Sequence, residues 1–128
     1  MNNVNEFRAA LNVARQSQTV IDGVTFTVQL PLPHEWRKSI EQHRDEHHSV
    51  KQAEAFRALL DRALVGWSGL TTKHLLPTVE KAESVDYGDE FKQILLDVRQ
   101  DIADELSIHL ALQNKAFQER YEAEEKNS

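Results

Sequence analysis

The first group of side chains that could do chemistry is the stretch HRDEHH, residues 43–48, which is rich in metal-binding residue types. His43 and His47 are four residues apart, so on a helix both imidazoles would lie on one face, with Glu46 nearby. The order is not the H-E-x-x-H of zinc proteases, and no obvious third ligand follows at a useful spacing. We interpret the stretch as a polar turn with exposed histidines; a metal site and a pH-sensitive contact are the alternatives.

Other catalytic patterns are missing from the sequence. No serine lies in G-x-S-x-G, because GWSG at residues 66–69 is one residue too short, and no glycine lies in G-x-x-x-x-G-K-[ST]. The chain has no cysteine, which excludes disulfides, thiolate zinc sites and cysteine nucleophiles. The acidic pairs Asp89-Glu90 and Asp104-Glu105 fit solvated helix surfaces. We therefore expect a non-enzymatic protein without catalytic residues, metal ligands or a cofactor.

The composition fits a single domain that spans residues 1–128. Of these residues 40% are hydrophobic and 28% are charged, and the net charge of −6 argues against a nucleic-acid-binding surface, which needs clustered Lys and Arg. No apolar run approaches the roughly 18 residues of a membrane span, and the N-terminal MNNVNEFRAA lacks the basic-then-apolar order of a signal peptide. We expect a cytoplasmic protein that contacts neither nucleic acid nor membrane.

Residues 1–33 are predicted to form a small β-rich element. Residues 1–17 carry both helix-like and strand-like spacings, and we expect a strand or irregular structure there. The clearest β signal is TVIDGVTFTVQL at residues 19–30, where apolar and polar residues alternate. Asp22-Gly23 lies between the two arms of this stretch and favours a tight type I′ turn, so we predict a hairpin that ends at the following PLP.

Residues 34–120 are predicted to form a helical body. HEWRKSIEQH has apolar residues at spacings of four and three, which indicates a first helix. Ser49 opens a second helix through a capping box with Gln52. Gly66 is expected to end that helix in the left-handed conformation, and a connecting region with a proline breaker follows at residues 69–86.

The last helical stretch is expected to bend, because about thirty-five unbroken helical residues would be long for a domain of this size. Asp86 or Asp89 can cap its start, and a bend is expected near Gln100 with Asp101 as a second cap. The acidic residues 121–128 are expected to fray. The apolar stripe of this stretch is Phe91, Ile94, Leu95, Val98, Ile102, Leu106 and Leu110, and it runs on toward Phe117. The predicted class is α+β, mostly α: a small N-terminal β-hairpin followed by a bundle of three to four helices.

Two tryptophans are candidates for partner contacts. Trp36 lies in the first turn of the predicted first helix, and Trp67 lies just past the predicted end of the second. Packing into the core is one role for each of them. Anchoring a partner is the other, since interface hot spots favour tryptophan.

The order of two segments resembles the small tail assembly chaperones of long-tailed bacteriophages and prophages. In that family a V-x-G-W-x-G-[VL] segment precedes a loop, and a helix start of the type Y/F-S-x-E-N-x-x-x-L-L follows. Residues 65–70 read VGWSGL, one spacer shorter, and residues 87–91 read YGDEF, with Leu95 and Leu96 after them. The resemblance covers residues 19–120, although TTKHLLPTVEKAES stands in place of the family's D-G-x-P turn.

The resemblance implies a non-enzymatic chaperone of virion morphogenesis in the host cytoplasm. Such proteins bind the tape measure protein, keep its long apolar helices soluble and help tail-tube subunits assemble around it. The tail-tube protein and a second copy of the chain are therefore further expected partners. The candidate partner-binding residues are Trp36, Trp67, Leu70, Phe91 and Leu95.

Two alternatives stay open at the level of the sequence. One is a phage head–tail connector or tail completion protein, which would form a stable ring. The other is a small metal-dependent enzyme that uses His43, His47 and an acid.

Overall fold

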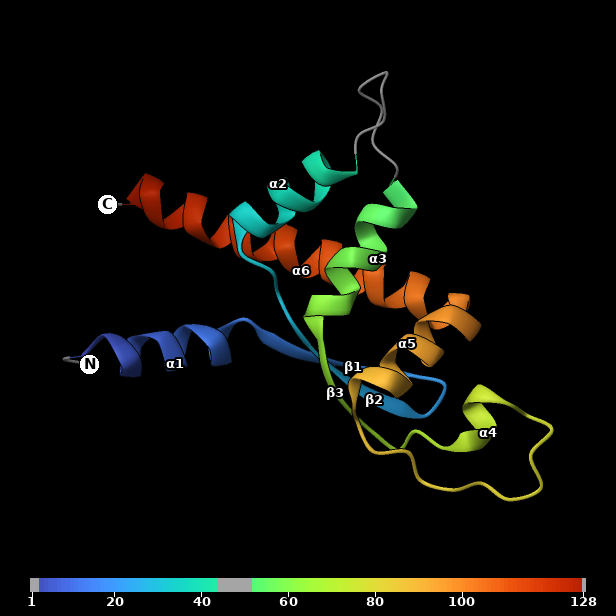
Figure 1. The fold of residues 1–128 in the computed structure, drawn as a ribbon. Helices are drawn as coiled ribbons and strands as arrows, with labels where there is room; N and C mark the ends of the chain where they lie inside the picture. Colours follow the sequence, from blue (N-terminus) through green and yellow to red (C-terminus); the bar gives the residue numbers. More distant parts are fainter. Residues whose placement is uncertain (1–2, 44–51, 128) are drawn as a thin grey trace.

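The fold is an α+β arrangement in which helices cover one face of a small antiparallel sheet. The structure is a computed structural model that describes residues 3–43 and 52–127. Strand order is β1-β2-β3, and α3, α5 and α6 lie together against the sheet (Figure 1). The predicted class, mostly helical with an N-terminal hairpin, is confirmed. In chain order the elements are α1 (Val4–Ala14), β1 (Gln16–Ile21), β2 (Val24–Gln29), α2 (Pro33–Gln42), α3 (Gln52–Ala63), β3 (Leu64–Ser68), α4 (Thr72–Leu75), α5 (Asp89–Val98) and α6 (Gln100–Asn127).

The hairpin forms as predicted around Asp22-Gly23. Both turn residues have positive φ, 53° at Asp22 and 75° at Gly23, as a type I′ turn requires. The strands pair from Ile21 opposite Val24 back to Gln16 opposite Gln29, so the strand signal begins earlier than expected. Alternate residues of β2 are buried against the helices, whereas those between them are half-buried. One face of the sheet therefore carries the core.

The prediction of strand or irregular structure at residues 1–17 is wrong, because α1 occupies most of this stretch. The Asn3 side chain caps the helix by accepting a hydrogen bond from the Glu6 amide at 2.7 Å. No residue of α1 is buried, and the helix extends away from the body (Figure 1). The helix-like spacing of the sequence therefore decides the local structure without help from the core.

The junction between α1 and β1 is held by Arg15, which is buried. Its guanidinium donates to the carbonyl oxygen of Leu30, from Nε at 2.9 Å and from Nη2 as well. The Leu30 amide donates in turn to the Arg15 carbonyl at 2.8 Å. These bonds fix the point and the direction at which α1 leaves the sheet.

The prediction that Gly66 ends a helix is also wrong. α3 ends at Ala63, and the chain continues directly into β3, in which Gly66 pairs with Thr27 of β2. A register shift at this pair leaves Val65 as an extra residue. The left-handed conformation occurs later, at Gly69 with φ 86°. The glycines of this stretch do indicate a turn, but the turn follows β3. A strand of only five residues is too short to be recognised from hydrophobic periodicity.

The predicted first helix is confirmed as α2. Its start is capped by Glu35, whose carboxylate accepts from the Leu32 amide at 2.8 Å. α2 packs on α3, where the Ser39 hydroxyl donates to the Ala55 carbonyl at 3.0 Å. The expected capping box cannot be assessed, since Ser49 lies outside the described residues.

The break between α5 and α6 confirms the expected bend, although neither expected cap is used. Gly88 is the N-cap of α5, and Asp101 lies inside the first turn of α6. The Arg99 guanidinium donates to both Asp101 carboxylate oxygens at 2.9 Å, and these bonds lower the pKa of Asp101 to about 2. Arg99 also reaches Asp22 of the hairpin turn at 3.1 Å. The acidic C-terminal residues, expected to fray, continue α6 to Asn127.

The apolar stripe of the last helices is only partly buried. Its members beyond the bend, and Leu95 before it, belong to the core with Leu96 and Ala103. Phe91, Ile94 and Val98 face outward and remain 41%, 43% and 54% exposed. We call these three residues the outer strip. They stay exposed because the apolar arc of α5 is wider than the surface that the sheet and α6 cover.

Candidate functional site

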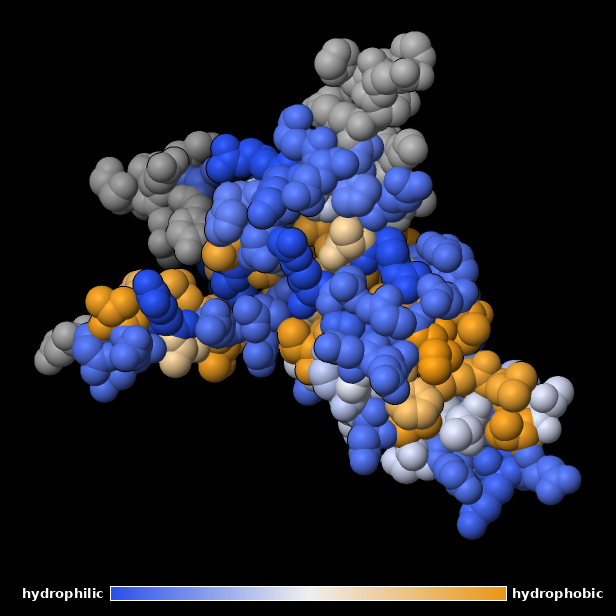
Figure 2. Space-filling model, in the orientation of Figure 1, coloured by the Kyte–Doolittle hydropathy of each residue, from blue (hydrophilic) through white to orange (hydrophobic). Residues whose placement is uncertain are grey.

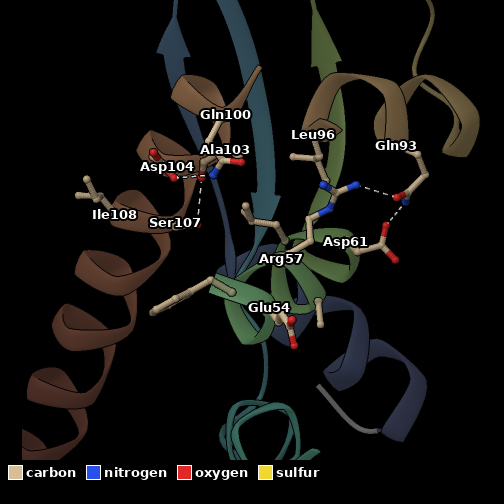
Figure 3. A pocket seen from close by; sticks show the side chains of 13 residues that line it. Glu54, Arg57, Asp61, Gln93, Leu96, Gln100, Ala103, Asp104, Ser107 and Ile108 are labelled. Atoms are coloured by element: carbon tan, nitrogen blue, oxygen red, sulfur yellow. Dashed lines mark hydrogen bonds between the residues drawn. The ribbon is translucent and has the colours of Figure 1, made fainter. Parts of the chain in front are cut away.

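A cavity of about 870 Å³ lies between α3, α5 and α6 (Figure 3). We call it the groove. Its apolar lining comes from all three helices and comprises Phe56, Ala58, Leu60, Leu96, Ala103 and Ile108. Its polar lining comprises Glu54, Arg57, Asp61, Gln93, Gln100, Asp104 and Ser107, none of which is buried. An apolar floor is therefore bordered by polar residues that stay in contact with water.

The wall between α3 and α5 is closed by polar bridges. Arg57 Nη2 lies 2.9 Å from Asp97 Oδ1 and donates to Gln93 Oε1 at 3.0 Å. The Gln93 amide donates to the Asp61 carboxylate (Figure 3). These contacts hold the two helices at a fixed spacing, so that the groove is preformed.

The border of the groove is acidic. Glu54, Asp61 and Asp104 supply three carboxylates, and the single cation among the lining residues, Arg57, is already paired with Asp97. Charges at the edge of an apolar site select partners of opposite sign and speed their encounter. A ligand with an apolar stripe and basic flanks therefore complements this site.

The volume of the groove lies within the ~300–1,000 Å³ of small-molecule pockets, but its chemistry differs from theirs. Such pockets place polar groups inside an apolar cavity to orient the ligand. Here the polar lining residues are all at least partly exposed, whereas Leu60, Leu96 and Ala103 of the apolar lining are buried. The arrangement suits the apolar face of a helix from another chain.

The histidine stretch at residues 43–48 lies outside the described residues except for His43. His43 follows α2, and its Nδ1 lies 2.7 Å from the Ser39 carbonyl oxygen. Glu46 and His47 lie outside the described residues. Within residues 3–43 and 52–127 no group of three or more His, Cys, Asp or Glu side chains is arranged to hold a metal ion.

Trp67, a predicted partner contact, lies in β3 opposite Phe26. Its side chain makes contacts within the chain. Its Nε1 donates to the Val85 carbonyl at 2.8 Å, and its ring meets the edge of Tyr87 at a centroid distance of 4.9 Å. The residue thus fastens the start of the segment before α5 to the sheet. Leu70, three residues further on in the family-like stretch, is 1% exposed and belongs to the core.

The other predicted contacts divide between surface and interior. Phe91 is in the outer strip and accessible, whereas Leu95 is fully buried at 0% exposure. Trp36 is half-buried and packs edge-on against Phe56 of the groove, with ring centroids 6.3 Å apart. Its indole nitrogen is buried without a hydrogen-bond partner in the part of the chain that the structure describes.

A second set of contacts, which the sequence does not predict, surrounds the buried Lys92. Its Nζ donates to the Asp61 carbonyl at 2.5 Å and lies 3.5 Å from the Asp89 carboxylate. The Tyr87 hydroxyl donates to the Leu64 carbonyl at 2.8 Å and accepts from the Lys92 ammonium group at 3.4 Å. α5 is therefore tied to the end of α3 by main-chain acceptors, which carry no sequence signal.

A serine–histidine contact joins the sheet to α6. Ser17 Oγ and His109 Nε2 lie 2.8 Å apart across 92 residues of sequence, so no local pattern could reveal them. Burial lowers the pKa of His109. The distance suits a nucleophile and its base, but no carboxylate among the described residues bonds the other ring nitrogen. We interpret the pair as a structural contact between β1 and α6.

Comparisons of the chain with protein-family models, curated proteins and solved structures gave no match. Within the described residues, none of the helices combines the length and the apolar character that crossing a membrane requires. The groove and its surroundings are therefore the basis for assigning a function.

Substitutions at the two tryptophans provide a matched test of the hydrogen bond between Trp67 and the Val85 carbonyl. Trp67→Phe keeps an aromatic ring but leaves the Val85 carbonyl without its donor, whereas Trp36→Phe removes an indole nitrogen that has no partner in the described part of the chain. An unsatisfied buried polar group costs roughly 1–3 kcal/mol. We expect urea denaturation to show a loss of unfolding free energy larger by that amount for Trp67→Phe. Equal losses would contradict the assigned role.

His109 predicts a dependence of stability on pH. Because burial lowers its pKa below the ordinary 6.5, the unfolded chain takes up a proton at higher pH than the folded chain does. The contribution of neutral His109 is complete above pH 6.5 and is lost as the pH falls through 6.5 toward the lowered pKa. Urea denaturation at several pH values should show a smaller decrease in His109→Gln than in the wild type. Identical pH profiles would exclude this effect.

Proposed function

We propose that the protein is a non-enzymatic phage tail assembly chaperone that holds an amphipathic helical segment of the tape measure protein in the groove. The observation that carries this proposal is the preformed apolar groove between α3, α5 and α6, with its acidic border. A long apolar helix in water aggregates unless its apolar face is covered. A groove of this kind supplies the cover without any chemical step.

The mode of binding follows from helix-in-groove recognition, in which residues at i, i+3, i+4 and i+7 of the bound helix contact the apolar floor. Glu54 and Asp104 border the groove from α3 and α6, on opposite sides of the opening (Figure 3). Basic residues on both flanks of the client helix would meet these carboxylates. The net charge of −6 favours a soluble complex, since like-charged complexes repel one another.

The resemblance to tail assembly chaperones supports the choice of client. It rests on residues 65–70 and 87–91, and these two segments are in contact through Trp67 and Tyr87. Their contact fastens α5 beside the groove, so the similar residues have a structural task close to the proposed site. The host cytoplasm is the compartment in which such assembly takes place, and the tail-tube protein is the second proposed partner.

The proposal is tested by co-expression with the candidate tape measure protein encoded in the same genome. We expect the client to become soluble and to co-purify with the chain. Ile108→Glu places a charge in the groove at a residue that is 60% exposed, so the fold tolerates it. We expect this variant to weaken binding at least about tenfold, or about 1.4 kcal/mol.

The matched control is Val20→Glu, which adds the same charge at a 66% exposed residue of β1 outside the groove. Binding by this variant should equal that of the wild type. Absence of any complex with tail components, or equal loss in both variants, would contradict the proposal. A defined ring of the chain alone would instead favour a head–tail connector or tail completion protein.

A further inference from the structure

The helix α1 has an apolar face that the rest of its own chain leaves open. Val4, Phe7 and Leu11 follow one another at spacings of three and four, and they are 65%, 54% and 38% exposed. Apolar side chains gather on α1 at the left of the space-filling view (Figure 2). Such a face on a projecting element marks an interaction surface.

An isolated helix of this length needs a partner. α1 has eleven residues, and helices shorter than about 12–15 residues are marginal in water without tertiary packing. The cap that Asn3 provides contributes about 1 kcal/mol, which does not replace a packed face. A contact that covers the apolar face of α1 would therefore stabilise this helix.

The groove of the same molecule is out of reach for α1. The bonds between Arg15 and Leu30 fix the start of β1, and from there α1 extends away from α3 and α5 (Figure 1). A second copy of the chain has no such restriction. Each copy therefore carries an uncovered apolar helix and an unfilled apolar groove.

The dimensions of the helix and the groove agree. Val4 to Leu11 spans about 10 Å of helix at 1.5 Å per residue. The residues of α6 that line the groove run from Gln100 to Ile108, which is about 12 Å on the same scale. The apolar face of α1 thus matches the length of the groove.

The charges are complementary as well. Arg8 follows Phe7 in the sequence and lies at the edge of the apolar face of α1. It forms no ion pair within the described residues. Glu54 and Asp104 border the groove, and neither carboxylate has a cationic partner in the described part of the chain. Arg8 of one copy can therefore pair with a border carboxylate of another.

We infer that the chain associates with a second copy of itself by placing α1 of one copy in the groove of the other. This inference concerns the chain alone and does not rest on the proposed chaperone function. If both are correct, α1 and the client compete for one groove, and removal of the α1 contact frees it.

The test is sedimentation velocity of the full chain, without any client, over a range of concentrations. Wild type should associate reversibly, whereas Phe7→Glu and Ile108→Glu should each raise the dissociation constant at least tenfold. Val13→Glu is the matched control in α1, because Val13 is 70% exposed and turned away from Phe7, and it should associate like the wild type. All three substitutions are at exposed residues outside the core, and circular dichroism checks that each variant stays folded.

A mixture of the two impaired variants identifies the contact. Phe7→Glu keeps an intact groove and Ile108→Glu keeps an intact α1, so the mixture should associate where each variant alone does not. A wild type that stays monomeric at every concentration overturns the inference. It is equally overturned if Ile108→Glu associates normally, or if the mixture fails to restore association. None of these outcomes depends on whether the tape measure protein binds.

Discussion

The pairing of β3 with β2 is the constraint on which the rest of the structure depends. β3 follows α3 without a connecting loop, so its register opposite Thr25 and Phe26 also sets the position of α3 against the sheet. From β3, Trp67 captures the Val85 carbonyl, and the Leu64 carbonyl receives the Tyr87 hydroxyl. The segment before α5 is thereby fixed, and α5 is placed beside α3. The groove is the space that remains between these two helices and α6.

The chain carries more apolar surface than its core uses. The core covers one face of the sheet and the inner faces of α3, α5 and α6. It leaves α1, the outer strip of α5 and part of the groove lining, namely Phe56, Ala58 and Ile108, at least partly open to water. Charged residues, 28% of the chain, keep such a molecule soluble while it presents these surfaces. Unfilled apolar faces are costly unless a partner covers them, so their number in a small chain fits a protein whose work is association.

The sequence predicted those elements whose signals are local. The Asp22-Gly23 turn, α2 and the break before Gln100 follow from turn chemistry, helical spacing and length. It failed where pairing with a distant segment decides the structure, as in β3. The exposure of the outer strip could not be read from the sequence either, because it depends on how much of the apolar arc of α5 the sheet and α6 cover. The groove could not be predicted for similar reasons, since its lining comes from three helices and the contacts that position α5 join residues far apart in the sequence. Of the five predicted partner residues, Phe91 is exposed and Trp36 packs on a lining residue, while Leu70 and Leu95 are core.

The central claim, that the groove receives a helix of the tape measure protein, is tested most directly by methyl NMR of the labelled chain. A helical peptide from that protein, with an apolar stripe and basic flanks, is titrated into it. The methyl signals of Leu60, Leu96 and Ile108 in the groove should shift, and those of Val20 on the sheet should not. Shifts confined to Ile94 and Val98 of the outer strip, or no shifts at all, would contradict the claim.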